Sequence, residues 1–186
     1  MKILDRHMDA FYFAVGAHSQ TQKYGNYPYI YHLIKVYEVG VETGYGESEK
    51  FDDEMKGMLL HDVMEDTHHN YADVKKHFNV RVADIVITVS DGTFKNRKLR
   101  KKEAWPRLRE FSQNDSGAII VKSADIIANL RQSILDIDDG VRRGLSDLYI
   151  HEVPEFIEEF KEFMDPKHVD LMNSAVDTIK EKMGLE

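Results

Sequence analysis

Residues 59–67 read LLHDVMEDT, an apolar helical run that ends in one histidine and three carboxylates. His61 and Glu65 are four residues apart, and so are Asp62 and Asp66, so each pair is predicted to share a helix face one turn apart. An imidazole and three carboxylates this close together are unfavourable unless solvent or a cation neutralises them. A His-Asp pair alone is common, so other segments must decide whether this stretch carries chemistry.

Two further segments support a metal site. His32 lies just inside a predicted helix, and Asp125 lies within an apolar helix, on the face it shares with Lys122 and Asn129. A buried aspartate needs a partner, and a metal ion is one of the best available. Two imidazoles and two carboxylates suit Mn, Fe, Zn, Co or Ni, with positions left open for water and substrate. The candidate ligands are His32, His61, Asp62 and Asp125.

Helical periodicity extends over nearly the whole chain and predicts an all-α fold, a single helical bundle spanning residues 1–186. Residues 22–28 are expected to form a loop, and the β-branched run Ile85–Val89 also allows a strand. Pro154 is expected to start or kink a helix. Asp115 or Ser116 is expected to cap the helix that contains Asp125. Helices are predicted over about 4–18, 30–41, 53–66, 71–78, 81–90, 98–111, 116–134, 154–163 and 166–183.

Composition sets the outer limits of function. The chain has 186 residues, of which 42% are hydrophobic and 31% charged, as is usual for a globular domain. It contains no cysteine, so any metal must be held by His, Asp and Glu. No long apolar run and a charged N-terminus predict no membrane span and no signal peptide, and therefore a cytoplasmic protein. The net charge of −8 disfavours a nucleic-acid partner.

The segment from Lys95 to Arg109 departs from this acidic balance, with eight Lys or Arg residues among fifteen. It is either a solvated helix face or an anion-binding flank beside a site for a phosphorylated small molecule. The sequence alone leaves both interpretations open.

Three motifs in this order resemble the HD superfamily of phosphohydrolases. The nearer resemblance is to the hydrolase domain of SpoT-type alarmone enzymes and to their small stand-alone metazoan homologues. It covers residues 4–160, nearly the whole chain, and a stand-alone hydrolase without a synthetase region is expected. The matching segments read HSQTQKYGNYPYIYH at 18–32, LLHDVMEDT at 59–67 and KSADIIANLR at 122–131.

This resemblance implies a role for each matching residue. His32, His61, Asp62 and Asp125 match the ligands of one divalent metal ion, with Mn²⁺ expected. Glu65 and Asp66 match the acidic pair that positions and activates the attacking water. The expected substrate contacts are Lys23, Lys95, Arg97, Lys98, Asn129 and Tyr149. Gln22 departs from the pattern, because the family usually has an arginine there, and this puts the preference for guanine in question.

The resemblance implies metal-dependent hydrolysis of a nucleotide phosphoester, with removal of the 3′-pyrophosphate from (p)ppGpp as the leading expectation. An NADPH 2′-phosphatase and an HD-type nucleotidase or dNTP triphosphohydrolase would share the metal site. A non-catalytic nucleotide-binding regulator is the alternative from another class. The Glu65-Asp66 pair favours a catalyst, and no obligate protein partner is expected.

Overall fold

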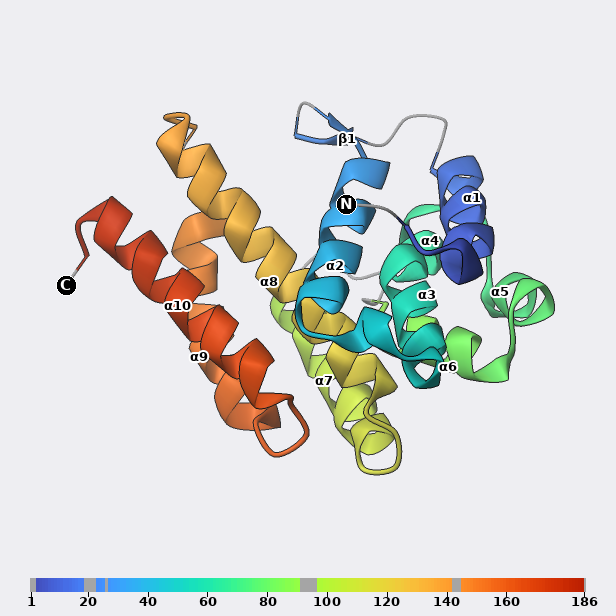
Figure 1. Cartoon of the computed structure of the whole chain (residues 1–186). Helices are drawn as coiled ribbons and strands as arrows, with labels where there is room; N and C mark the ends of the chain where they lie inside the picture. Colours follow the sequence, from blue (N-terminus) through green and yellow to red (C-terminus); the bar gives the residue numbers. More distant parts are fainter. Residues whose placement is uncertain (1–2, 19–22, 26, 91–96, 142–144, 186) are drawn as a thin grey trace.

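The chain folds almost entirely into α-helices, and the prediction of an all-α fold is confirmed (Figure 1). The computed structural model describes residues 3–18, 23–25, 27–90, 97–141 and 145–185. Within these ranges a two-stranded antiparallel hairpin joins α1 to α2, formed by β1 (Lys23–Tyr24) and β2 (Tyr27–Pro28). The helices are α1 (Met8–Ala17), α2 (Ile30–Glu42), α3 (Asp52–Leu60), α4 (Val63–Asp66), α5 (Tyr71–His77), α6 (Val80–Val89), α7 (Arg97–Ser112), α8 (Gly117–Asp138), α9 (Leu145–Phe160) and α10 (Pro166–Met183).

Helix α8 is the centre of the arrangement. It packs against α2, α3 and α6 on one side, against α9 and α10 on the other, and against α7 (Figure 1). A helix covered on several sides must be apolar over most of its circumference. Ile119, Val121, Ala124, Ile127 and Leu130 are accordingly fully buried. Asp125 lies among these residues and is buried in the interior.

Two glycines bring the helices around the future site close together. A Cβ on Gly40 in α2 would lie 2.4 Å from the Met58 sulfur in α3. A Cβ on Gly57 in α3 would lie 3.0 Å from Ile85 in α6 and 3.1 Å from Val121 in α8. A side chain at either position would force its neighbours to shift, so the glycines favour the close approach of α2 to α3 and of α3 to α6 and α8.

An ion-pair network at the start of α8 fixes the other end of this packing. Arg81 in α6 contacts Glu54 Oε1 in α3 at 2.5 Å and Asp115 Oδ2 at 2.7 Å. Asp115 Oδ1 also accepts a hydrogen bond from the Gly117 N–H, so Asp115 supplies the side-chain cap of α8. Ser116 occupies the N-cap position without a side-chain cap bond.

Three local expectations need correction. The helix predicted over 53–66 is interrupted, because His61 and Asp62 form a turn between α3 and α4. The helix predicted over 81–90 is present as α6, so the strand alternative for Ile85–Val89 falls away. Pro154 lies inside α9 and does not start it. The loop expected over 22–28 contains the short hairpin.

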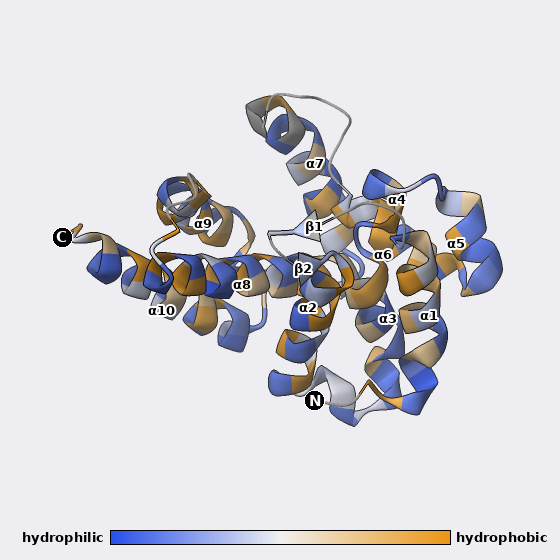
Figure 2. Cartoon of the chain, turned by 90° about the horizontal axis from the view of Figure 1, so that it is seen from above, coloured by the Kyte–Doolittle hydropathy of each residue, from blue (hydrophilic) through white to orange (hydrophobic). Residues whose placement is uncertain are grey.

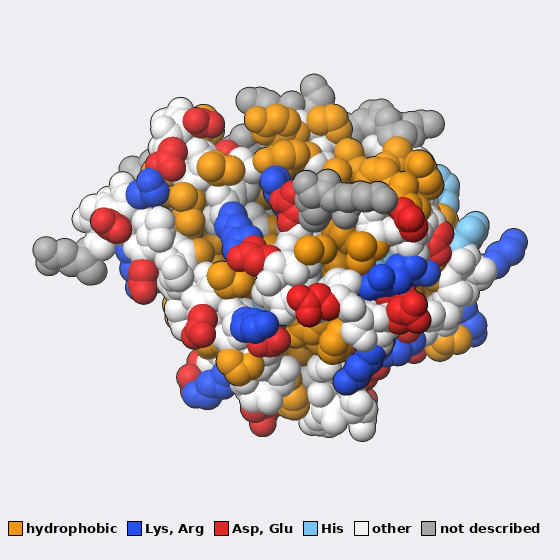
Figure 3. Space-filling model, in the orientation of Figure 1, with side chains coloured by type: hydrophobic (Ala, Val, Ile, Leu, Met, Phe, Trp, Pro, Cys, Tyr) orange, Lys and Arg blue, Asp and Glu red, His pale blue; other side chains and the backbone are white. Residues whose placement is uncertain are grey.

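The described helices include none that is both long enough and apolar enough to cross a membrane. On the face seen in Figure 3, acidic and basic side chains are interspersed among apolar ones. Figure 2 shows α7 extending to one side of the layer that contains α2 and α8.

Candidate metal centre and active-site cavity

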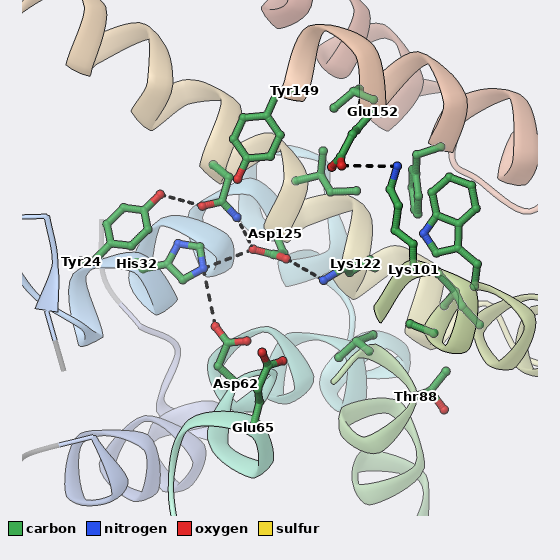
Figure 4. A pocket seen from close by; sticks show the side chains of 18 of the residues that line it. Tyr24, His32, Asp62, Glu65, Thr88, Lys101, Lys122, Asp125, Tyr149 and Glu152 are labelled. Atoms are coloured by element: carbon green, nitrogen blue, oxygen red, sulfur yellow. Dashed lines mark hydrogen bonds and ion pairs between the residues drawn. The ribbon is translucent and has the colours of Figure 1, made fainter. Parts of the chain in front are cut away.

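Two histidines and two carboxylates from three segments meet at one point, and Figure 4 shows three of them, His32, Asp62 and Asp125. His32 lies in the first turn of α2, His61 and Asp62 form the turn after α3, and Asp125 lies within α8. His32 Nε2 is 3.2 Å from Asp125 Oδ1 and 3.8 Å from Asp62 Oδ2. His61 Nε2 is 2.8 Å from Asp62 Oδ2 and 3.7 Å from Asp125 Oδ1. One donor atom from each of His32, His61 and Asp62 lies within 4.8 Å of the others.

The hydrogen bonding of His61 fits metal ligation. Its Nδ1 is 3.0 Å from the backbone oxygen of Met58, which can only accept, so Nδ1 carries a proton. Its Nε2 is buried and forms no hydrogen bond with a described residue, although Asp62 is close. An imidazole held through one nitrogen, with the other directed at carboxylates, is the usual arrangement of a metal-binding histidine. The His/Asp cluster therefore fits a divalent metal ion.

Asp125 is held in place by Lys122, Asn129 and His32. Lys122 Nζ lies 3.1 Å from Asp125 Oδ2, and Asn129 Nδ2 donates to Asp125 Oδ1 at 2.6 Å. Burial raises the pKa of Asp125, but the charges of Lys122, His32 and His61 outweigh burial and hold that pKa well below its usual range. Asp125 is therefore an anion at neutral pH, although it is only 8% exposed.

Asp62 is held by Tyr29, whose hydroxyl donates a hydrogen bond to Asp62 Oδ2. Burial and the nearby charge of Asp62 raise the pKa of Tyr29, so its hydroxyl remains a donor. Tyr29 also stacks on His18, with the ring centroids 4.8 Å apart. Sequence analysis did not assign Tyr29 to the site, although it lies three residues before His32.

In the metal-free protein, a proton on His61 takes the place of the metal cation. Burial lowers the pKa of His61, but the charges of Asp62 and Asp125 outweigh burial and raise that pKa to about 9. Burial raises the pKa of Asp62, but the charge and hydrogen bond of His61 outweigh burial and lower that pKa to about 2. At neutral pH the metal-free site is therefore a protonated histidine between two carboxylates.

The cluster lies at one end of a cavity of about 300 Å³. Asp62, Glu65 and Asp125 give the cavity acidic side chains, and Trp105, Phe156 and other apolar side chains also line it. The cavity is lined by Tyr24, Tyr29, His32, Asp62, Glu65, Thr88, Val89, Lys101, Ala104, Trp105, Leu108, Lys122, Asp125, Ile126, Asn129, Tyr149, Glu152, Val153 and Phe156. A cavity that combines apolar and aromatic side chains with a few polar groups is the usual form of a small-molecule site.

A comparison with known families identifies this arrangement. Residues 10–149 match the family model described as HD domain, and this range includes all four candidate ligands. The chain belongs to the HD domain family.

Curated relatives of this HD domain are 28–30% identical to it over the aligned residues. A guanosine-3′,5′-bis(diphosphate) 3′-pyrophosphohydrolase, MESH1, from Mus musculus is 29% identical over 81% of this chain and 78% of that protein. The Drosophila melanogaster protein of the same name is 28% identical over 66% of this chain and 65% of its own length. The bifunctional (p)ppGpp synthase/hydrolase SpoT of Escherichia coli is 30% identical over 69% of this chain, but the match spans only 18% of that protein.

A solved structure described as a metazoan ortholog of SpoT that hydrolyzes ppGpp has the same fold as this HD domain. The two superpose with a TM-score of 0.72 over 100% of this chain and 99% of the other, at 22% sequence identity.

The remaining predicted site residues of the HD domain are described to different extents. Glu65, Asn129 and Tyr149 line the cavity, whereas Asp66, which is exposed like Glu65, lies outside its lining, although its charge acts on Tyr29. Gln22 and Lys95 lie outside the described residues. Lys23 lies in β1, and Arg97 and Lys98 lie in α7, but their side chains are outside the description. Sequence analysis did not name Tyr24, Trp105 or Glu152 as lining residues, and it included Lys101 only within the basic segment Lys95–Arg109.

The pKa of His61 leads to a pH-dependent prediction. A metal ion requires the unprotonated Nε2, so its binding is expected to release about one proton per site at about pH 7.5. Because His61 is protonated below about pH 9, apparent metal affinity should rise by up to about tenfold per pH unit and level off above that value. Calorimetric titration of the apoprotein with Mn²⁺ in buffers of different ionisation enthalpy measures the released proton. A binding heat that does not depend on the buffer would contradict the prediction.

Proposed function

We propose that this chain is a metal-dependent phosphohydrolase that removes the 3′-pyrophosphate from (p)ppGpp, and that residues 1–186 form one HD-type domain. The observation that carries the proposal is that the His/Asp cluster and Glu65 share a cavity with Lys122, Asn129 and Tyr149. The names of the Mus musculus and Drosophila melanogaster relatives support (p)ppGpp as the substrate.

We assign His32, His61, Asp62 and Asp125 as the ligands of one divalent ion, with Mn²⁺ as the expected metal. Two imidazoles and two carboxylates suit this class of ion and leave coordination positions for water and substrate. When bound, the ion supplies Lewis acidity to phosphoryl oxygens and acidifies water at the site.

The surrounding residues orient the substrate and move the proton. Glu65, with Asp66 on the same turn, accepts a proton from the attacking water. The water oxygen bonds to the phosphorus attached to O3′, the P–O3′ bond breaks, and O3′ leaves with the proton that Glu65 accepted from the water. The products are GDP or GTP and pyrophosphate. Lys122 next to Asp125 offsets negative charge at this end of the cavity.

The cavity also receives the nucleoside. Asn129 and Tyr149, which line it, are proposed to contact the sugar or base, and Lys23 to contact the nucleotide. Lys95, Arg97 and Lys98 are proposed to contact the phosphates. These substrate contacts stay predictions. So do a cytoplasmic location and the absence of nucleic-acid, membrane or obligate protein partners.

Product analysis of the Mn²⁺-loaded protein tests the proposal. We expect ppGpp to yield GDP and pyrophosphate, and we expect the apoprotein to be inactive until Mn²⁺ is restored. NADPH and a panel of dNTPs are incubated in parallel. Inorganic phosphate from NADPH, or triphosphate from a dNTP, without ppGpp hydrolysis would replace the proposed substrate. Turnover of none of them, combined with tight nucleotide binding, would indicate a regulator.

A further inference from the structure

Tyr24 in the hairpin contacts the metal centre in two different ways. Its ring stacks on the imidazole of His32, with centroids 4.6 Å apart and planes 22° apart. Its hydroxyl donates to Asn129 Oδ1 at 2.7 Å, across 105 positions of sequence (Figure 4). One side chain therefore contacts a candidate ligand and the neighbour of another.

The hydrogen bonds from Tyr24 run in one direction toward Asp125. An ionised carboxylate only accepts hydrogen bonds, so Asn129 must turn its amide nitrogen to Asp125, at 2.6 Å from Oδ1. This leaves the Asn129 oxygen to accept from Tyr24. The same Asp125 oxygen lies 3.2 Å from His32 Nε2. The hydrogen bonds from Tyr24 through Asn129 and the stacking of Tyr24 on His32 therefore act on one pair of candidate ligands, Asp125 and His32.

The hairpin that carries Tyr24 is fixed to the start of α2. Tyr24 pairs with Tyr27 across the two strands. Tyr27 stacks on Tyr31 in the first turn of α2, with ring centroids 4.5 Å apart. Tyr24 also contacts Tyr29 edge to face at 6.4 Å. Tyr24 is therefore held on the helix turn that presents His32.

We propose that Tyr24 is a positioning residue of the metal centre. It holds the ring plane of His32 by stacking and the carboxylate of Asp125 through Asn129. Neighbours that orient metal ligands in this way are worth about 10- to 100-fold in metal affinity. The inference rests on the metal ligands proposed above, but it does not depend on which nucleotide is hydrolysed.

Metal titration of three variants tests the assignment. Tyr24→Phe keeps the ring and removes the hydroxyl, Tyr24→Leu removes both contacts, and Tyr27→Phe changes a tyrosine of the same hairpin that does not line the cavity. Mn²⁺ affinity of the apoproteins is measured from the paramagnetic resonance signal of free Mn²⁺. We expect affinity to fall about tenfold in Tyr24→Phe and further, toward about 100-fold, in Tyr24→Leu. Tyr27→Phe should bind like the wild type.

Two further measurements separate positioning from a structural role or a substrate contact. The visible absorption of bound Co²⁺ reports ligand geometry and should change in Tyr24→Phe but not in Tyr27→Phe. The apoproteins of Tyr24→Phe and Tyr27→Phe should unfold at similar temperatures. Wild-type Mn²⁺ affinity with an unchanged Co²⁺ spectrum in Tyr24→Phe would overturn the inference, as would a raised KM as the only defect. If the wild type itself binds no metal, the proposed metal site fails as well.

Discussion

The double variant Asp62→Ala/Asp125→Ala is expected to bind no stoichiometric metal and to hydrolyse substrate no faster than the metal-free protein. Both carboxylates are anionic at neutral pH, because neighbouring cations hold their pKa values below the usual range. Removing both leaves only His32 and His61, and also removes the negative charge that offsets a divalent cation. Elemental analysis after equilibrium dialysis against Mn²⁺ measures the loss.

A control with the same change in net charge is Asp9→Ala/Asp138→Ala. These carboxylates are about half exposed, with side-chain exposures of 51% and 49%, and each pairs with one surface lysine. The control should retain its metal and its activity. Full metal content in the Asp62/Asp125 variant, or an anomalous scattering peak elsewhere in crystals of the wild type, would show that the ligands are assigned wrongly.

The helical fold is predictable because its largest signal is local. In α8, apolar residues recur over the whole length, and Asp125 within the apolar run already indicates an interior polar site. Capping residues also lie next to the helices they start, as Asp165 does before Pro166 of α10. Such signals need no knowledge of distant segments.

The turn at His61 and Asp62 shows where local periodicity fails. In a regular helix, neighbouring side chains point about 100° apart, since one turn takes 3.6 residues. Here the His61 and Asp62 side chains both point into the same cluster, with their donor atoms 2.8 Å apart. The interruption between α3 and α4 permits this arrangement, and it follows from the tertiary site, not from the local sequence.

The tyrosines around the cluster could not be assigned from the sequence for a similar reason. Tyr29 reaches Asp62 across 33 positions, and Tyr24 reaches Asn129 across 105. Their partners are set by the packing of the hairpin against α8 and the α3–α4 turn. No spacing rule within residues 23–29 contains this information. The candidate ligands were easier to identify because they lie in three motifs whose order resembles that of the HD superfamily.

Replacing Glu65 with Gln is expected to lower kcat by roughly 10²–10⁴, the usual contribution of general acid–base catalysis. Glu65 lies in α4, after the turn at His61 and Asp62, and lines the cavity with Asp62 and Asp125. The amide keeps the size of the side chain but cannot accept the proton of the attacking water, so KM and metal content should change little. The matched variant is Asp66→Asn on the same turn, where a smaller loss is expected because Asp66 lies outside the cavity lining. Steady-state kinetics with ppGpp and elemental analysis of both variants provide the test. Normal turnover in Glu65→Gln would make this carboxylate structural, whereas loss of the metal would make it a ligand.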